Sequence, residues 1–232
     1  MTDLIDTTEM YLRTILELEE ENIVPLRARI SERLGHSGPT VSQTVARMER
    51  DGLVVVSGDR HLELTTEGRR KAVQVMRKHR LAERLLSDVI GLEWEYVHEE
   101  ACRWEHVMSE QVERKLLSIL NDPVESPYGN PIPGLEELGG AQTAPFGQGV
   151  QNIVDLVAVQ SEPQVRQIRR LGEPAQLDPE LLSQLKQSGV VPGSTGTFSR
   201  AGSYVLVEVD GFGDGLELPN EVASHIFVDA SV

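Results

Sequence analysis

The sequence predicts a mostly α-helical protein with a small β-rich domain at its C-terminal end. Apolar residues recur at helical spacing through most of the first 120 residues. From Asn152 onward the pattern changes to short β-like runs separated by glycine and proline turns. Between these parts, residues 122–150 are rich in proline, glycine and small polar residues, which is typical of a linker. We therefore expect helical domains first and a small, partly open β-barrel after the linker.

The composition indicates a globular protein that stays inside the cell. Of the 232 residues, 39% are hydrophobic and 25% are charged, which is an ordinary balance for such a protein. No apolar run approaches the roughly 18 residues that a membrane span needs. Acidic residues stand near the N-terminus, where an export signal would carry positive charge. Cys102 is the only cysteine, which excludes an intrachain disulfide and fits the reducing cytoplasm.

Two helices are expected before residue 35. Asp6 stands three residues before Glu9, an arrangement that caps and starts a helix, and apolar residues follow at helical spacing. A second, shorter helix is expected over residues 25–34, where Gly35 ends it.

A third helix and a hairpin complete the N-terminal part. Residues 37–39 open this helix, because proline is suited to its first turn, and Gly52 is suited to the position after its end. Two short strands, residues 53–56 and 61–64, then flank a turn and predict a hairpin. Helix, turn, helix and hairpin in this order predict a winged helix-turn-helix.

Further helices and strands are expected downstream. Thr65 caps a long helix over residues 67–90, and Gly91 separates it from a second helix over residues 95–108. A third helix ends before Asn121. In the C-terminal part, the β-like runs are residues 153–159, 202–209 and 225–228, and the helical stretch is residues 179–187.

The third helix has the two faces that a recognition helix in the DNA major groove requires. Its inward face is apolar and consists of Val41, Val45 and Met48. Its opposite face is polar and consists of Thr40, Gln43, Thr44, Arg47 and Arg50. The net charge of −15 argues against nucleic acid, but residues 27–50 hold five arginines against two glutamates, a local charge of +3. DNA binding at this one patch is therefore compatible with the acidic total.

Individual roles in DNA binding follow from side-chain chemistry. Gln43 is suited to base edges, and Ser37 and Pro39 offer small contacts for thymine methyl groups. The residues suited to DNA phosphates are Thr40, Ser42, Arg47 and Arg50 on the third helix, Arg27 and Arg29 on the second, and Arg60 at the hairpin tip. A helical hairpin with a solvated arginine face would have the same periodicity, so the pattern alone leaves both interpretations open.

Donor groups typical of a transition-metal site gather in the middle of the chain. Three of the six histidines, His79, His98 and His106, lie within 28 residues beside Cys102. Since each helical residue advances about 100°, four donors share about a quarter of one helix surface. They are His98, Cys102, Glu105 and His106. His79 and Glu83, four residues apart, form a second chelating pair, and such clusters indicate a divalent metal.

Catalysis is the weaker interpretation of the same residues. Cys102 and His106 lie one helical turn apart, a poor setting for an exposed nucleophile. The His-Glu-x-x-His motif of catalytic zinc sites is absent from the sequence. Each donor alone would more often be a core cysteine or a surface histidine, so the metal hypothesis depends on the cluster. We expect a protein that is not an enzyme.

Five segments of the chain resemble the iron-dependent regulators of the diphtheria toxin repressor family. They are residues 6–14, 37–53, 76–86, 101–109 and 126–134. The resemblance is close over about residues 1–138 and loose beyond them. It implies a winged helix-turn-helix DNA-binding domain (1–74), a helical metal-binding and dimerisation domain (75–140), a linker (141–150) and an SH3-like domain (151–232).

The resemblance also implies two metal sites per chain. The primary, activating site would use Met10, Cys102, Glu105 and His106. The ancillary site would use His79, Glu83, His98, Glu173 and Gln176. The last two residues fit the family's Glu-x-x-Gln spacing, and an alternative alignment places Arg170 there instead. An anion-binding group beside this site would consist of Arg80, Ser126 and Asn130.

The implied function is that of an Fe²⁺-activated transcriptional repressor of iron uptake and storage genes. It would bind palindromic operators in double-stranded DNA as a homodimer, with one or two dimers per operator, and without membrane contact. Co²⁺, Ni²⁺, Zn²⁺ or Mn²⁺ would substitute for Fe²⁺, although the sulfur atoms of Met10 and Cys102 favour Fe²⁺, Co²⁺ or Ni²⁺ over Mn²⁺. Two alternatives stay open: a manganese-responsive regulator of the same family, and a cytosolic metal-dependent enzyme or metal buffer.

Overall fold

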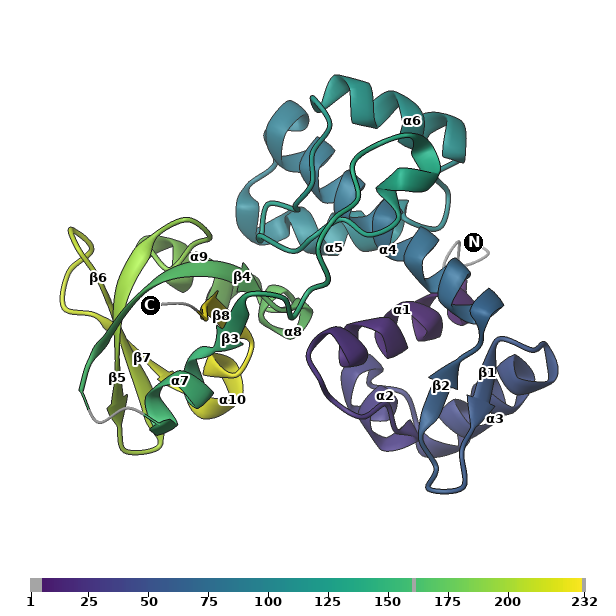
Figure 1. Cartoon of the computed structure of the whole chain (residues 1–232), viewed down its shortest axis with the longest axis horizontal. Coiled ribbons are helices and arrows are strands. Elements are labelled where there is room, and N and C mark those ends of the chain that lie inside the picture. Colours follow the sequence, from purple (N-terminus) through teal and green to yellow (C-terminus); the bar gives the residue numbers. More distant parts are fainter. Residues whose placement is uncertain (1–5, 160–161, 231–232) are drawn as a thin grey trace. The chain divides into compact units, whose positions relative to one another are not determined.

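The computed structural model describes residues 6–159 and 162–230 (Figure 1). These residues form two compact units, and each unit combines separate segments of the chain. The first unit holds residues 1–82, 101–124 and 132–145, and the second holds residues 83–100, 125–131 and 146–232. These two units are defined by packing, whereas the four domains expected from the sequence are defined by function. The four domain ranges therefore stay a prediction. Across the described residues, no helix has both the length and the apolar character to cross a membrane.

The N-terminal part of the first unit is the winged helix-turn-helix that the sequence predicts. Its elements are α1 (Thr7–Glu20), α2 (Arg27–Leu34), α3 (Gly38–Arg50), β1 (Val54–Val56) and β2 (Leu62–Leu64). The side chain of Asp6 caps α1 by accepting hydrogen bonds from the backbone nitrogens of Thr8 and Glu9. Gly35, with a φ of 64°, ends α2, and Ser37 caps α3. The strands β1 and β2 pair antiparallel as the wing.

One apolar core holds these elements together. Its members include Tyr11, Leu12 and Ile15 from α1, Ile30 from α2, and Val41, Val45 and Met48 from α3, all fully buried. Gly68, in the helix that follows the wing, lies so close to the wing that an added Cβ would stand 1.9 Å from the carbonyl oxygen of Leu53. The apolar stripe that the sequence predicts on the third helix, Val41, Val45 and Met48, therefore anchors α3 in this core.

The middle helices differ from their predicted bounds at two places. α4 (Thr66–Leu85) begins where expected, with Thr65 accepting a hydrogen bond from the nitrogen of Gly68. It then continues as a π-helical turn, η1 (Leu86–Ile90), up to Gly91. α5 (Trp94–Trp104) is shorter than the expected helix 95–108, because residues 105–107 form a turn. α6 (Glu110–Ile119) and a 3₁₀ turn, η2 (Leu135–Leu138), complete the first unit.

The second unit contains the β-rich domain that the sequence predicts. Six antiparallel strands run in the order β3-β8-β4-β5-β6-β7. They are β3 (Val150–Asn152), β4 (Gln164–Leu171), β5 (Thr195–Ala201), β6 (Tyr204–Val209), β7 (Leu216–Pro219) and β8 (Ile226–Asp229). Short helices α8 (Glu173–Gln176), α9 (Pro179–Gln187) and α10 (Asn220–Ala223) connect them, and α9 has the predicted bounds.

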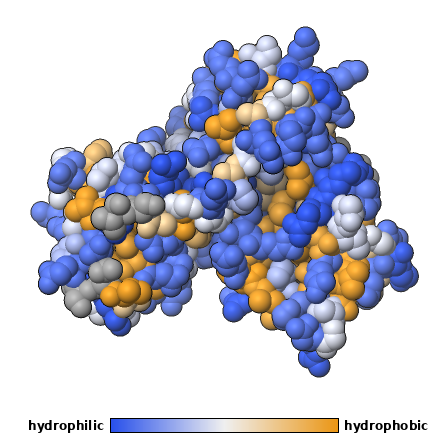
Figure 2. Space-filling view, viewed as in Figure 1, coloured by the Kyte–Doolittle hydropathy of each residue, from blue (hydrophilic) through white to orange (hydrophobic). Residues whose placement is uncertain are grey.

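One predicted strand is wrong: residues 153–159 form a helix, α7 (Ile153–Val159). The side chain of Asn152 accepts a hydrogen bond from the backbone nitrogen of Asp155 at 2.8 Å, as a helix cap does. The buried residues of α7 are Ile153, Leu156 and Val157, a helical spacing of three and four. In the view of Figure 2, hydrophilic residues cover most of the surface, and apolar residues show in smaller patches.

Candidate metal centres and nucleic-acid interface

The polar face of α3 is exposed along the helix. On α3 and at its N-terminal cap, the exposed members of the predicted DNA-binding set are Ser37, Pro39, Thr40, Ser42, Gln43, Arg47 and Arg50. The hydroxyls of Ser37 and Thr40 lie 2.8 Å apart, so the cap orders the start of the helix. Arg47 donates to the hydroxyl of Thr8 over 3.4 Å, which places its guanidinium near the N-terminal end of α1.

Thr44 corrects the predicted faces of this helix. The sequence places it on the polar surface, but it is buried. Its side chain is hydrogen-bonded to Tyr11 of α1 instead of facing solvent. The position therefore serves the packing of α1 against α3.

The remaining predicted DNA contacts lie on α2 and the wing. Arg29 is exposed and pairs with Glu32 over 2.9 Å, while Arg27 is half-buried. Arg60 stands at the exposed tip of the hairpin with a φ of 70°, in the left-handed region. These arginines are suited to phosphate contacts from outside the recognition helix.

Three of the predicted primary metal ligands lie within five residues of the chain at the C-terminal end of α5. Cys102 lies in the last turn of the helix, and Glu105 and His106 lie in the turn that follows. The Glu105 side chain is buried, and its Oε1 atom stands 3.3 Å from Nε2 of His106. The sequence placed all four of its clustered donors on one helix, and the structure places these two just beyond its end.

The fourth predicted ligand, Met10, lies on α1 between two residues that contact the same cluster. Glu9, one position before it, has Oε2 at 2.8 Å from Nδ1 of His106. Arg13, three positions after it, forms an ion pair with Glu105. Met10 itself is partly buried against the N-terminal core. Helix α1 therefore meets the end of α5 on both flanks of Met10.

A positive charge already stands among these donor groups. Nη1 of Arg13 donates to Oε2 of Glu105, and it lies 2.8 Å from Nδ1 of His79 and 3.5 Å from Sγ of Cys102. Oε2 of Glu105 also lies 2.7 Å from Nδ1 of His79. The thiol of Cys102, the carboxylate of Glu105 and the imidazole of His79, gathered around this cation, are donor types that fit a divalent transition metal.

The charges around Glu105 keep it ionised. Burial by itself would raise the pKa of this carboxyl group. Burial is the largest single effect, but the charge of Arg13, the hydrogen bond and charge of His79 and the charge of His106 together outweigh it, so the pKa falls from 4.5 to about 2. The Glu105 carboxylate is therefore available as an anionic ligand at neutral pH.

A second group of donors lies in the second unit. Nδ1 of His98 stands 3.4 Å from Oε1 of Glu83 and 3.4 Å from Oε2 of Glu173. Donor atoms of these three buried residues all lie within 4.8 Å of one another. His79 precedes Glu83 by one turn of α4. The structure thus brings Glu173 of the C-terminal domain to the predicted ancillary ligands Glu83 and His98.

Gln176 also has a feature expected of a ligand. Its Nε2 atom donates to the carbonyl oxygen of Leu171 over 2.7 Å. Its Oε1 atom is buried, and no described residue donates a hydrogen bond to it. A buried carbonyl oxygen without a donor is costly unless a cation or water satisfies it.

The predicted anion-binding residues are engaged in contacts within the protein. Arg80 donates to both carboxylate oxygens of Glu20, at 3.0 and 2.6 Å. The hydroxyl oxygen of Ser126 accepts a hydrogen bond from the nitrogen of Tyr128, and the amide nitrogen of Asn130 donates to the carbonyl oxygen of Leu171. Their role toward an anion stays a prediction.

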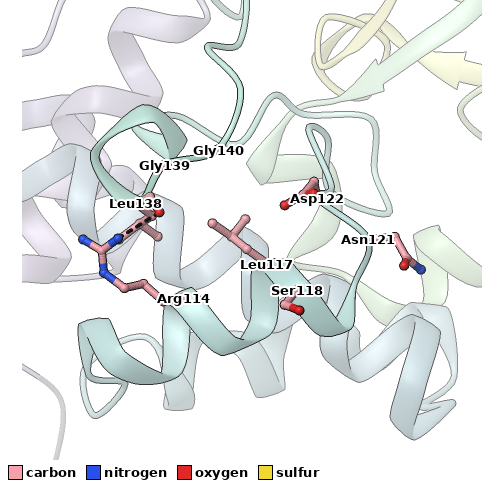
Figure 3. Close-up of a pocket in the computed structure, with 8 residues that line it drawn as sticks. All are labelled: Arg114, Leu117, Ser118, Asn121, Asp122, Leu138, Gly139 and Gly140. Carbon is pink, nitrogen blue, oxygen red and sulfur yellow. Dashed lines mark hydrogen bonds between the residues drawn. The ribbon is translucent and has the colours of Figure 1, made fainter.

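A cavity of about 460 Å³ in the first unit lies apart from this chemistry. Figure 3 shows its lining residues along α6 and η2, where Arg114 donates to the carbonyl oxygen of Leu138 over 2.9 Å. Of the described residues that line it, none is a predicted ligand or DNA contact.

Sequence reasoning missed a buried network of charged residues on α1 and α2. Arg13 and Glu17 are both nearly buried and pair over 2.8 Å. Glu17 and Glu21 in turn face Arg33 of α2, at 3.7 and 3.0 Å. The only sign in the sequence is the spacing of Arg13 and Glu17, which are four residues apart.

Comparisons with known proteins agree with this architecture. Residues 3–62 match the family model described as "Iron dependent repressor, N-terminal DNA binding domain", and residues 65–134 match "Iron dependent repressor, metal binding and dimerisation domain". The iron-dependent repressor IdeR of Mycobacterium leprae is 56% identical over 232 residues, 99% of each chain. The diphtheria toxin repressor of Corynebacterium diphtheriae is 51% identical over 229 residues, again 99% of each.

Solved structures of similar regulators share the fold. The crystal structure of IdeR from T. acidophilum superimposes with a TM-score of 0.76 at 27% identity, covering 98% of this chain and 99% of that one. A manganese-dependent transcriptional repressor in complex with manganese superimposes with a TM-score of 0.81 at 25% identity, covering 97% and 100%. The predicted fold class is thereby confirmed, and the chain belongs to the iron-dependent repressor family.

Proposed function

We propose that the protein is an Fe²⁺-activated transcriptional repressor that binds palindromic operators as a homodimer. The observation that carries this proposal is the contact of α1 with the end of α5 on both flanks of Met10. The named relatives are repressors that depend on iron or carry the diphtheria toxin repressor name. In a repressor of this family, a cluster of metal ligands beside the DNA-binding helices is suited to making DNA binding depend on the metal.

The activating site would consist of Met10, Cys102, Glu105 and His106. Bound there, Fe²⁺ would supply the positive charge that draws the α1 donor to the three donors at the end of α5. Helix α1 also holds α3, because Tyr11 is hydrogen-bonded to Thr44. Met10 therefore links metal binding to α1, the helix that contacts the recognition helix α3. Since metal and DNA would favour the same arrangement of α1, each would tighten binding of the other.

The chemistry of the ligands supports iron as the natural activator. The sulfur atoms of Met10 and Cys102 are soft donors, which favour Fe²⁺, Co²⁺ or Ni²⁺ over Mn²⁺. Zn²⁺ and Mn²⁺ would serve as weaker or non-natural substitutes. The manganese-dependent structural neighbour is only 25% identical, while the iron-dependent relative from M. leprae is 56% identical. A manganese-responsive regulator is the second candidate because that neighbour shares the fold so closely.

A second metal ion per chain would bind at the ancillary site. Its ligands would be His79, Glu83, His98, Glu173 and Gln176. The close approach of Glu83, His98 and Glu173 and the buried oxygen of Gln176 support this assignment. Such a site would hold the C-terminal domain to the helices that carry Glu83 and His98.

Homodimerisation would use apolar side chains that one chain leaves exposed. Val107, Val112 and Ile119, before and along α6, are 60%, 46% and 57% exposed. Exposed apolar groups of this size favour burial in an interface. Two-fold symmetry would then place two copies of α3 on the two half-sites of a palindrome. The repressor would act in the cytoplasm, and its targets would be iron uptake and storage genes. Two dimers per operator would be the larger assembly.

A gel-shift titration on an AT-rich palindrome, with and without Fe²⁺ under anaerobic conditions, tests the proposal. We expect specific binding with Fe²⁺ or Co²⁺ and negligible specific binding in chelator. Cys102→Ala is expected to lose the response to metal, while the exposed α9 variant Glu180→Ala keeps it. Equal operator affinity in metal and in chelator would contradict the proposal, and stronger activation by Mn²⁺ than by Fe²⁺ would favour the second candidate.

A further inference from the structure

Arg13 contacts two of the four proposed primary ligands, Cys102 and Glu105. Its Nη1 atom donates to Oε2 of Glu105, and its two Nη atoms lie 3.5 and 3.6 Å from Sγ of Cys102. The Arg13 side chain is nearly buried and is part of the apolar-faced helix α1. A guanidinium held by two proposed metal ligands is a cation in the place where a metal ion would bind.

The guanidinium and a metal ion cannot use these donors together. Bonds from a transition metal to a thiolate and to a carboxylate oxygen are about 2.0–2.3 Å long. An ion bonded to Cys102 and Glu105 would therefore stand beside Nη1 of Arg13, and the two positive charges would repel at short range. The electron pairs of Glu105 Oε2 that accept from Arg13 would also be needed by the metal ion.

Glu17 offers Arg13 a second partner without a large movement. Nε of Arg13 already lies 2.8 Å from Oε1 of Glu17, one turn further along α1. The other oxygen of Glu17 stands 3.7 Å from Nη1 of Arg33 on α2. A guanidinium released by Glu105 can therefore turn toward Glu17 and keep its charge paired inside the protein. The pairing of Arg33, in the first helix of the helix-turn-helix, would change with it.

We propose that Arg13 competes with the activating metal ion for Glu105 and Cys102, and that Glu17 receives its guanidinium when metal binds. This inference rests on the proposed function of Cys102 and Glu105 as metal ligands. In the metal-free protein Arg13 holds the donors together, and the cost of displacing it raises the metal concentration needed for activation. Arg13 is thus a positioning residue that sets the threshold of the sensor.

Binding of Co²⁺ to the full-length chain tests the competition directly. Since Cys102 is the only cysteine, absorption from a cobalt–thiolate bond reports metal that is bound to Cys102. Arg13→Met is expected to bind Co²⁺ at least tenfold more tightly and to unfold at a lower temperature without metal. Glu17→Gln, which is isosteric and leaves Arg13 fewer partners, is expected to bind Co²⁺ at least threefold more weakly. Added to Arg13→Met, the Glu17→Gln change is expected to have no further effect.

Arg77→Met is the matched control, because Arg77 is also buried and paired, with Glu113 at 2.6 Å and Glu137 at 2.8 Å. It is expected to destabilise the chain while leaving the Co²⁺ affinity within twofold of the wild type. Unchanged or weaker Co²⁺ binding by folded Arg13→Met overturns the competition and leaves the metal site standing. If Arg13→Met does not fold, Glu17→Gln decides, and unchanged binding by it overturns the proposal. Absence of the cobalt–thiolate band in the wild type overturns the site and the competition together.

Discussion

The hydroxyl of Tyr11 lies 2.8 Å from Nδ1 of His36, so α1 is tied to the turn that leads into the recognition helix. The Tyr11 ring also lies beside the imidazole of His36, tilted by 38°, with ring centroids 5.7 Å apart. Its side chain is hydrogen-bonded to Thr44 inside α3. The residue directly after the proposed ligand Met10 therefore contacts the recognition helix and the turn before it.

Tyr11→Phe is expected to weaken this connection without removing the ring from the core. A buried hydrogen bond contributes roughly 0.5–1.5 kcal/mol to stability, and we expect a loss of about that size in the free energy of urea unfolding. The operator affinity at saturating metal is expected to fall as well, measured by gel shift. Tyr204→Phe, at an exposed site in the second unit, is the control and is expected to change neither quantity. A Tyr11→Phe protein with wild-type stability and affinity would contradict this role.

The same residue predicts a loss of stability at alkaline pH. Burial raises the pKa of Tyr11 above 10.0, although the hydrogen bond with Thr44 and the charge of Arg47 act in the opposite direction. The unfolded chain then releases the phenol proton at a lower pH than the folded chain does. This contribution to stability is present below pH 10 and declines as the pH rises through the folded-state pKa. Unfolding of Tyr11→Phe between pH 9 and pH 11 is expected to show a smaller decline than that of the wild type.

Cys102→Asp is expected to change the ranking of the activating metals. A hard carboxylate would replace a soft thiolate, so Mn²⁺ would gain relative to Fe²⁺ and Co²⁺. Gel shifts with each metal in turn measure the ranking. Cys102→Ser, which removes the soft donor without adding a charge, is expected to weaken the response to all of them. An unchanged ranking in Cys102→Asp would identify Cys102 as a packing residue instead of a ligand.

Gln43→Ala is expected to reduce sequence-specific binding. Its exposed side chain is placed to contact base edges, so the loss on the operator is expected to be roughly 1–3 kcal/mol, with little change on random DNA. Arg47→Ala and Arg50→Ala serve as the comparison. They are expected to weaken both kinds of binding alike and to flatten the dependence on salt. Equal losses on operator and random DNA for Gln43→Ala would mean that the register of the recognition helix is wrong.

The recognition helix could be predicted closely because its signals are local. Ser37 caps α3, and the buried stripe of Val41, Val45 and Met48 follows the period of one helix. Thr44 is the exception, because its side chain is buried and hydrogen-bonded to Tyr11, a residue 33 positions earlier in the chain. The periodic pattern of apolar residues along α3 does not report a contact of Thr44 with another helix.

For residues 153–159, the amino-acid composition predicts a strand where the structure has a helix. Their β-branched, apolar character favours a strand, and a helix of seven residues is too short to show its period clearly. The hydrogen bond from Asp155 to Asn152 identifies the cap in the structure. An Asn-x-x-Asp sequence is too common for this cap to be recognised from the sequence alone.

The metal clusters were predictable only as far as they follow the spacing of single helices. Glu83, four residues after His79, could be expected to share its face of α4. The ion pair of Arg13 with Glu105 joins residues 92 positions apart, and only the fold brings them together. An arginine and a glutamate with the spacing of Arg13 and Glu17 usually form a solvated pair on a helix surface, so this spacing does not predict that they are buried.

Glu173 and Gln176 are the ligands through which the C-terminal domain would enter the ancillary site. Glu173 lies 3.4 Å from His98, and Gln176 has a buried oxygen to which no described residue donates. Arg170, the alternative from the sequence, is a cation and lies 5.3 Å from the Phe146 ring centroid, an arrangement that suits packing. The structure therefore favours Glu173 and Gln176 as the pair to test.

The double variant Glu173→Ala, Gln176→Ala is expected to lose the ancillary metal while retaining the primary one. Neither residue is among the proposed primary ligands, so DNA binding would persist but require more metal. Calorimetric titration with Co²⁺ is expected to resolve two sites per chain in the wild type and one in the double variant. Glu180→Ala, Gln184→Ala, on the exposed face of α9, is the matched control and is expected to keep both sites. Identical isotherms for the wild type and the Glu173, Gln176 variant would remove both residues from the ligand set, because losing a carboxylate and a carbonyl donor must weaken any site that uses them.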